Sequence, residues 1–388
     1  MSPDGLNIVE IGERLRMARE DANLTQADAA DAIGVARTTL VAIEKGQRRI
    51  RTDELQQLSR LYKTSINALM RREAVHVDLV PRFRKADATH EQAANDAIRL
   101  LADLVKAEIE LENLLGINRS RNFPPERHIL PGNVRTQAES DALELRHWLG
   151  LGPSPIRELI TLMELEMGVR IYIRPLHAKI CGLFAYDDAV GACILLNALH
   201  PLERRTQTLA HELGHFISTR RNPDVLHENE PEDTREERYA NAFARGFLTP
   251  ARTVKQKFQE LTAGSDRLTR RHIILLAHTF GVSREAIGRR LEELGLTRKG
   301  TWDWFVMNGG ITNEQARQVL GELANDDNHQ PPANLRFDML AEQAWRRDLL
   351  SEGQLAELLK LDRIELREML DNLTIEGNEA DELPKLPG

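Results

Sequence analysis

The residues best suited to chemistry lie in one short stretch, His211-Glu212-Leu213-Gly214-His215. On an α-helix, His211 and His215 share one face with their Cβ atoms about 6 Å apart, so both rings can bind one tetrahedral metal ion. Glu212 is turned about 100° around the helix, where its carboxylate can act as general base on a water molecule beside that ion. The spacing therefore predicts a Zn²⁺ site with a catalytic carboxylate.

The residues around this motif predict a buried helix. The stretch reads TLAHELGHFI, and its apolar face consists of Leu209, Leu213, Phe216 and Ile217. A surface helix with two solvated histidines does not fit this pattern. Because buried rings and a buried carboxylate are costly without partners, the pattern requires a metal ion or a tight hydrogen-bond network.

A third metal ligand has to come from outside the motif. The longer pattern HExxHxxGxxH needs a glycine at position 218 and a histidine at position 221, but Ser218 and Arg221 stand there. The remaining candidates are His227, Glu228, Glu230, Glu232, Asp233, Glu236 and Glu237. Most of them fall in a polar loop, whereas Glu237 opens an amphipathic helix and is followed one turn later by Asn241, a candidate hydrogen-bond partner for a ligand. A carboxylate on a second packed helix is what a glutamate-zincin site requires.

The elements that must position these residues precede and follow the motif. Three strands are predicted in quick succession, VRIYIRPL, ICGLFAY and ACILLN, at 169–176, 180–186 and 192–197. Because no helix separates them, we expect a small meandering sheet that leads directly into the helix of the motif. A polar loop at 221–236 and a helix at 236–248 that stops before Pro250 are expected to follow.

These segments resemble the ImmA/IrrE family of zinc metallopeptidases over about residues 90–300. The matching features are the strands, the Asn197 that ends the third strand, the pair Arg204 and Arg205, TLAHELGH, and an E-x-x-A-N-x-F-A helix. The resemblance implies a zincin-like endopeptidase that typically cleaves helix-turn-helix repressors after a stress signal. It also implies the roles of four residues: the metal ligands His211, His215 and Glu237, and the base Glu212.

The beginning of the chain has a different character. Residues 1–72 contain five predicted short helices with no proline after Pro3. Thr25 is a predicted N-cap and Gly34 a predicted helix end. The segment LTQADAADAIGVARTTLVAIEKG resembles the XRE (Cro/C1-type) helix-turn-helix family, which implies a DNA-binding domain.

Recognition of double-stranded DNA is assigned to five residues. Arg37, Thr38 and Thr39 stand at the start of the predicted recognition helix, where an arginine can read guanine and a threonine can contact phosphate or a thymine methyl group. By family position Gln26 binds the DNA backbone, and Arg48 lies where a DNA phosphate is expected. Residues 1–72 hold 12 Lys or Arg against 10 Asp or Glu, a net +2, whereas the whole chain has −8. We expect a homodimer on a palindromic operator; a helical module for protein contacts is the alternative.

Composition and pattern together predict a mostly α-helical protein with a small β-sheet (α+β). The expected domains are a helix-turn-helix domain at 1–72, a connector at 73–90, a metallopeptidase domain at 91–300 and a helical region with a disordered tail at 301–388. No apolar run is long enough for a membrane helix and no secretory signal is evident, so we expect a cytoplasmic protein without membrane contact. Two cysteines in strand-like runs are expected to be buried free thiols.

Three functions fit this organisation. In the first, a DNA-bound regulator carries a peptidase that cleaves a protein partner, such as a helix-turn-helix repressor or a toxin. In the second, the zinc site is not proteolytic, and the chain is a transcription factor or an autorepressing antitoxin; His227 as a fourth ligand would silence the site. In the third, the peptidase cuts its own connector. We favour the first, because a structural zinc site needs a fourth protein ligand and no general base.

Overall fold

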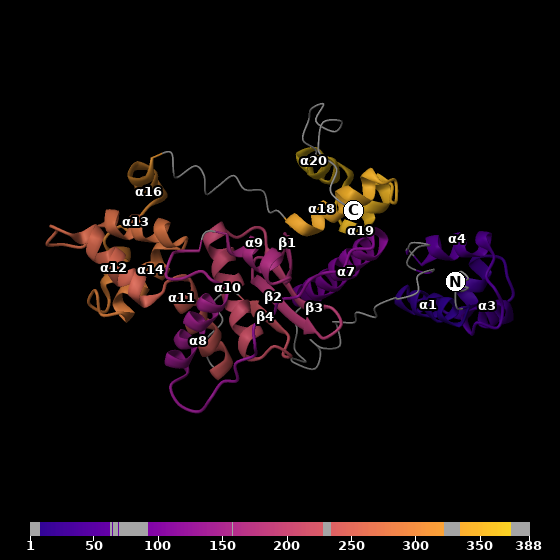
Figure 1. Cartoon of the computed structure of the whole chain (residues 1–388). Helices are drawn as coiled ribbons and strands as arrows, with labels where there is room; N and C mark the ends of the chain where they lie inside the picture. Colours follow the sequence, from indigo (N-terminus) through magenta and orange to yellow (C-terminus); the bar gives the residue numbers. More distant parts are fainter. Residues whose placement is uncertain are drawn as a thin grey trace, which may run out of the picture. The chain divides into compact units, whose positions relative to one another are not determined.

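The computed structural model describes residues 8–62, 64, 69, 92–156, 158–227, 234–321 and 334–373. The chain divides into two compact units, residues 1–76 and 77–388 (Figure 1). The predicted connector, the predicted C-terminal tail and most of the predicted fifth helix fall outside the described residues. Helices dominate both units and one small sheet lies in the second, so the predicted α+β fold class is confirmed.

The first unit contains a helix-turn-helix within four described helices. These are α1 (Ile8–Asp21), α2 (Gln26–Ala32), α3 (Arg37–Glu44) and α4 (Thr52–Leu61). The Oγ1 atom of Thr25 accepts a hydrogen bond from the backbone N–H of Asp28 at 3.2 Å and so caps α2. Gly34 has φ +68° in the turn before α3, a conformation that favours glycine. Local chemistry therefore fixes both ends of α2.

The sheet of the second unit is mixed. Its strands are β1 (Arg170–Arg174), β2 (Ile180–Asp187), β3 (Gly191–Asn197) and β4 (Asp224–His227), in the order β1-β3-β2-β4. Strand β1 runs parallel to β3, and β2 runs antiparallel to both β3 and β4. The predicted meander is therefore wrong, because β3 lies between β1 and β2.

Asn197 explains how β3 fits between the two strands that precede it. The connection from β1 to β2 crosses the end of β3, where the fully buried Asn197 side chain holds it. Its Oδ1 accepts the backbone N–H of Leu176 at 3.1 Å, and its Nδ2 donates to the backbone oxygen of Ile180 at 2.8 Å. Strand propensity alone gives no sign of such a crossing.

Strand β4 was missed by the sequence reading, which placed it inside the polar loop. It pairs with the outer side of β2 and buries Val225. Four residues with one buried apolar side chain give too weak an alternation to distinguish an edge strand from a loop. The consequence is that an edge strand, and not a loop, follows the helix of the motif.

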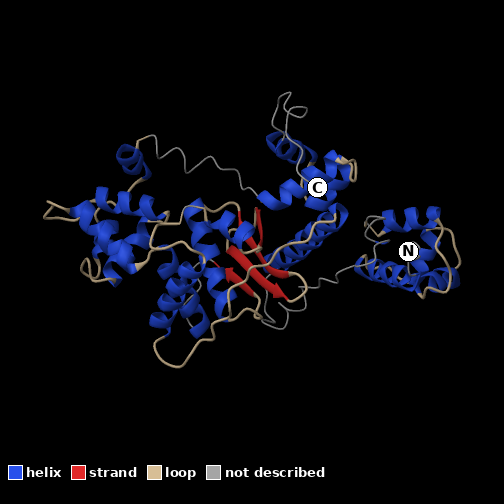
Figure 2. Ribbon diagram, in the orientation of Figure 1, coloured by secondary structure: helices blue, strands red, loops and turns tan. Residues whose placement is uncertain are grey.

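Both faces of the sheet are covered by helices (Figure 2). One face carries Ile171, Ile173 and Ile194 and packs on the helices around the motif. The other carries Tyr172 and Leu195 and shares a core with α7 (Gln92–Leu115), α18 (Leu335–Arg346), α19 (Glu352–Leu359) and α20 (Arg363–Leu373). Alternation along each strand thus produces two cores. Residues 334–373 pack into the second of these cores, together with α7 and the sheet. The predicted boundary between a metallopeptidase domain and a C-terminal region at residue 300 therefore stays a proposal.

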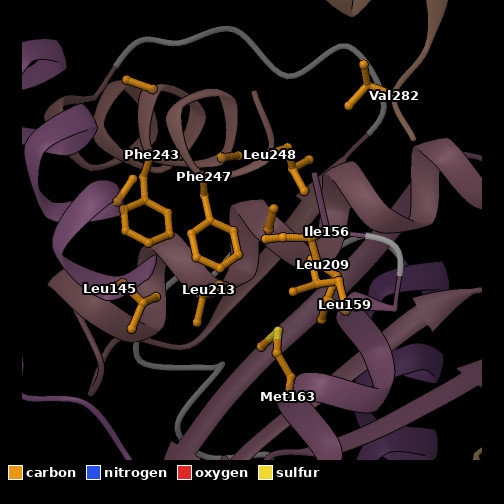
Figure 3. Close-up of a cluster of buried hydrophobic side chains, with 14 of the residues drawn as sticks. Leu145, Ile156, Leu159, Met163, Leu209, Leu213, Phe243, Phe247, Leu248 and Val282 are labelled. Carbon is orange, nitrogen blue, oxygen red and sulfur yellow. The ribbon is translucent and has the colours of Figure 1, made fainter. Parts of the chain in front are cut away.

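The first core holds α10, which carries the motif, and the helices packed around it. They are α8 (Val134–Trp148), α9 (Leu159–Thr161), the π-helix η1 (Leu162–Glu166), α10 (Leu202–Ser218) and α11 (Arg235–Leu248). Leu209 and Leu213 of α10, Phe243 and Phe247 of α11, and Leu145 of α8 belong to the cluster in Figure 3. The chain continues through α12 (Ala251–Thr262), α13 (Arg270–Phe280), α14 (Arg284–Glu293), α15 (Thr301–Met307) and α16 (Asn313–Leu320). The shared cluster of apolar side chains packs α10 and α11 tightly against each other.

Candidate metal centre

Helix α10 buries the motif as its apolar flanks predict. His211, Glu212 and His215 are 2%, 0% and 4% exposed. The Nε2 atoms of the two histidines lie 3.0 Å apart, so both rings point to one place. The two imidazole rings and the Glu212 carboxylate are thus buried together on one turn of α10.

Helix α11 brings the third group. Thr234 caps this helix by accepting the backbone N–H of Glu237 at 3.1 Å, which places Glu237 in the first turn. Its Oε2 lies 3.4 Å from the Nε2 of His211, and its Oε1 lies 3.2 Å from the Nε2 of His215. The structure therefore brings the three predicted ligands together, within 4.8 Å of one another.

Close contact between α10 and α11 lets Glu237 reach the two histidines. A Cβ atom added to Gly214 would lie 2.8 Å from the Cα atom of Ala240, closer than real Cβ contacts. Glycine in the middle of the motif therefore lets the backbone of α11 approach α10, one turn from Glu237.

The three groups have the dimensions of a zinc site. Zinc–nitrogen and zinc–oxygen bonds of about 2.0–2.1 Å in a tetrahedron separate neighbouring ligand atoms by about 3.3 Å. The observed separations of 3.0, 3.2 and 3.4 Å lie around that value. Two imidazoles and one carboxylate are also a ligand set that Zn²⁺ takes in catalytic sites. The residues present fit the ion.

The electrostatics of Glu237 favour its ionised form. Burial opposes the charge, but hydrogen bonds with His211 and His215 outweigh it and hold the pKa of Glu237 well below its ordinary value. A carboxylate that stays ionised can serve as a metal ligand at every physiological pH.

Two neighbours orient the rings. The Nδ1 of His211 lies 3.1 Å from the Oδ1 of Asn241, and the Nδ1 of His215 lies 3.4 Å from the Oγ1 of Thr219. A neutral His211 that donates its Nδ1–H to Asn241 keeps its Nε2 lone pair for a metal ion. The sequence pointed to Asn241 but missed Thr219, although its position four residues after His215, at the C-cap of α10, was a usable signal.

In the first unit, the three residues predicted to contact DNA bases lie at the start of α3. Arg37 and Thr38 are exposed and Thr39 is half-buried. Helix α3 packs on α2 and α1 through Leu40 and Ile43, which leaves its N-terminal end toward solvent. This arrangement is the one that a recognition helix needs.

Comparison with known families agrees with both units. Residues 15–69 match the helix-turn-helix model, and residues 165–292 match the IrrE N-terminal-like domain of the M78 peptidases. The chain therefore carries a helix-turn-helix segment followed by a segment of the M78 peptidase type. Both resemblances seen in the sequence are confirmed. No curated protein matches the chain. ComR from Streptococcus suis, a solved structure, matches with 11% identity over 95% of this chain and 94% of its own, at a TM-score of 0.16, which is too low to support a statement about fold.

In the M78 domain, the metal group opens into a pocket of about 200 Å³. His211, Glu237 and Asn241 line it, together with His227 from β4. Among the described residues the group of ligand atoms has three members, and His227 is not one of them. The loop candidates between β4 and α11 fall outside the described residues.

Tyr239 of α11 stands two residues after the ligand Glu237, and a tyrosine hydroxyl at such a place can stabilise a developing oxyanion. Tyr239 is fully buried and donates its hydroxyl to the Oδ2 of Asp141 on α8 at 2.8 Å. Burial, and after it this hydrogen bond, raise the pKa of Tyr239. The hydroxyl ties α11 to α8, and Tyr239 is not among the residues that line the pocket beside the metal group.

In the helix-turn-helix domain, two of the predicted DNA contacts already have protein partners. The Nε2 of Gln26 donates to the Oε2 of Glu44 at 2.8 Å, and Arg19 binds the same carboxylate at 2.7 Å. Arg48 makes two hydrogen bonds with Glu54, at 3.0 and 2.9 Å. The DNA contacts of all five predicted residues stay predictions, and Arg37 differs from Gln26 and Arg48 in being exposed.

No described helix is long and apolar enough to cross a membrane.

Proposed function

We propose that this helix-turn-helix protein is a DNA-binding transcriptional regulator whose M78 domain hydrolyses a peptide bond in a protein partner. The observation that carries the proposal is the buried group of His211, His215 and Glu237, with Glu212 on the same turn of α10. A helix-turn-helix repressor or a toxin is the proposed partner.

The chain's own residues divide the work. His211, His215 and Glu237 would hold Zn²⁺, while Asn241 and Thr219 keep the two rings in place. Bound by these residues, the ion would supply Lewis-acid polarisation of the scissile carbonyl and of a water molecule. Glu212 takes a proton from that water on its carboxylate and passes it to the leaving amine, as general base and then general acid. Burial of Glu212 keeps bulk water from competing for this proton.

Catalysis is favoured over a structural role for zinc. Structural sites use four protein ligands, whereas catalytic sites use three and leave one position for water or substrate. The described residues offer three, beside a pocket with room for substrate atoms. Movement of His227 onto the metal would convert the site to a closed one, which is the non-proteolytic alternative.

The helix-turn-helix unit is proposed to bind DNA through α3. Arg37, Thr38 and Thr39 are proposed to contact base edges and phosphate in the major groove, with Gln26 and Arg48 on the backbone. A homodimer on a palindromic operator is proposed, since a single recognition helix reads only a half-site.

The decisive experiment compares the wild type with Glu212→Gln. Both proteins, loaded with zinc, are incubated with a peptide library, and new amino termini are identified by mass spectrometry. We expect cleavage by the wild type and at least a hundredfold slower cleavage by the variant at equal zinc content. Cleavage that persists in the variant would rule out the base, and no cleavage by the wild type would leave a non-proteolytic zinc protein. The intact mass of each protein shows whether the chain cuts itself.

A further inference from the structure

The pocket beside the metal group has one wall made by a single face of α10. Gln207, Thr208 and His211 line this wall, together with Arg204. Gln207 precedes His211 by four residues, so the two side chains are neighbours on the same face of the helix. The opposite face of α10 carries the apolar residues of the first core. Gln207 therefore stands one turn from a metal ligand, on the pocket side of the helix.

Thr208 fixes this wall against the sheet. It is 4% exposed, and a Cβ atom added to Gly182 of β2 would lie 2.7 Å from its Cγ2 atom. Helix α10 and strand β2 are thus in close contact at Thr208, and close-packed contacts of this kind yield little. Gln207, the preceding residue, is only half-buried. Its side chain can reach into the pocket, while the backbone that carries it is held in place.

The amide of Gln207 has a capacity for hydrogen bonds that its neighbours do not use. Among the residues that the structure describes, no group is hydrogen-bonded to this side chain. A primary amide offers two N–H donors and a carbonyl acceptor. A substrate that fills the pocket displaces water from these groups, and polar groups that lose water without gaining a partner cost free energy. The best ligand for this place therefore supplies both an acceptor and a donor.

We infer that Gln207 is a substrate-binding residue that holds the backbone of the peptide substrate in an extended form. This inference rests on the proposed peptidase function. In an extended peptide the N–H and the C=O of one residue point to the same side, as they do in the paired residues of an antiparallel sheet. The amide of Gln207 can accept from the first and donate to the second. Because every residue except proline presents both groups, the contact tolerates any other side chain and disfavours proline.

The distance along α10 indicates which substrate residue is held. The four residues from Gln207 to His211 correspond to about 6 Å along a helix. An extended peptide covers about 3.3 Å per residue. The residue whose backbone binds Gln207 is therefore about two residues from the bond that is cut.

The test uses the full-length, zinc-loaded chain and blocked decapeptides based on one peptide that it cuts or, failing that, binds. In each decapeptide one residue is replaced by its hydroxy-acid analogue, so that an ester oxygen takes the place of one N–H. We expect one position, about two residues from the cut, at which this replacement raises KM about tenfold. The kcat should change little, because the lost hydrogen bonds serve substrate and transition state alike. Proline at this position should act in the same direction.

Two variants of Gln207 identify the group that binds the peptide. Gln207→Ala, which suits a helix, should raise KM about tenfold for the parent peptide and make the ester replacement neutral at that position. Gln207→Glu keeps the size of the side chain but replaces its N–H donors with a second acceptor, so it should bind the peptide no better than Gln207→Ala. The matched control is Gln259→Ala, an exposed glutamine of α12 outside the pocket lining. This control should keep the wild-type KM.

Fluorescence anisotropy gives a second readout that needs no turnover. The labelled parent and ester peptides are titrated with zinc-loaded Glu212→Gln, with and without Gln207→Ala. If the wild type cuts nothing but binding still depends on Gln207 and on the same N–H, the peptidase function is refuted and the backbone contact stands. If the wild type cuts but neither KM nor anisotropy responds to Gln207→Ala, the inference is overturned and the peptidase function stands. The absence of cleavage and of binding for every peptide would overturn both.

Discussion

Replacing Gly214 with alanine tests whether close packing of α10 on α11 builds the metal site. The new Cβ atom would lie 2.8 Å from the Cα and 3.2 Å from the Cβ of Ala240, where ordinary contact begins at 3.4 Å. Because the nearest atom belongs to the backbone, α10 and α11 have to separate by about 0.6 Å, the difference between 2.8 Å and ordinary contact. The surrounding side chains are close-packed and cannot absorb this shift. Glu237 lies one turn from Ala240 and moves with α11.

The expected magnitude follows from the tolerance of zinc coordination. Ligand distances vary by only about 0.2 Å in functional sites. A shift of about 0.6 Å should weaken zinc binding about tenfold to a hundredfold, the range seen when ligand support is lost. Overpacking should also lower the free energy of unfolding by about 1–3 kcal/mol.

The assay measures the zinc Kd by competition with a chromophoric chelator and the unfolding of the metal-free protein by circular dichroism. Gly353→Ala is the matched control, because its nearest neighbour, the Nη2 of Arg363, is 4.0 Å from the added atom. This control should leave zinc binding unchanged. A folded Gly214→Ala protein with wild-type zinc affinity would refute the reasoning.

The remaining predictions concern the metal, DNA and pH. Elemental analysis should find one zinc per wild-type chain and none in His211→Ala or Glu237→Ala; a variant that keeps a full equivalent would remove that residue from the ligand set. Arg37→Ala should weaken binding to the operator about tenfold to a hundredfold in a gel-shift titration, whereas Arg267→Ala, an exposed arginine of the second unit, should not. Equal affinity of the Arg37→Ala protein would show that α3 is not the recognition helix. Burial, and after it the charge of Glu108, raise the pKa of Glu164 to about 8 from 4.5. The folded protein then keeps a proton that the unfolded chain releases, so the free energy of unfolding should fall as the pH rises from about 4.5 to 8. Chemical denaturation should show a smaller fall for Glu164→Gln, and an identical slope would contradict the assignment.

Much of the candidate site could be predicted because its parts are local. The positions of His211, Glu212 and His215 follow from the helical period, and burial follows from the apolar residues between them. Thr234 and Glu237 form a helix start that the sequence displays. Asn241 follows Glu237 by one turn, so it too could be named in advance.

The strand arrangement could not be predicted in the same way. Consecutive strands usually pair with each other, so the sequence favoured a meander. The observed order depends on the bonds that Asn197 makes with a loop about 20 residues away in the chain. Strand β4 depends on pairing with β2, and its own residues carry little signal.

The sequence by itself determined which side chains are the candidate metal ligands, on which helices they stand, and that a helix-turn-helix precedes them. These properties come from backbone periods and caps that operate over a few residues. Only the tertiary structure decided that Glu237 meets the histidine pair and that Arg204 and His227 line the same pocket. Each of these depends on two distant surfaces packing together, and a short stretch of sequence is compatible with many such partners until the whole core is assembled.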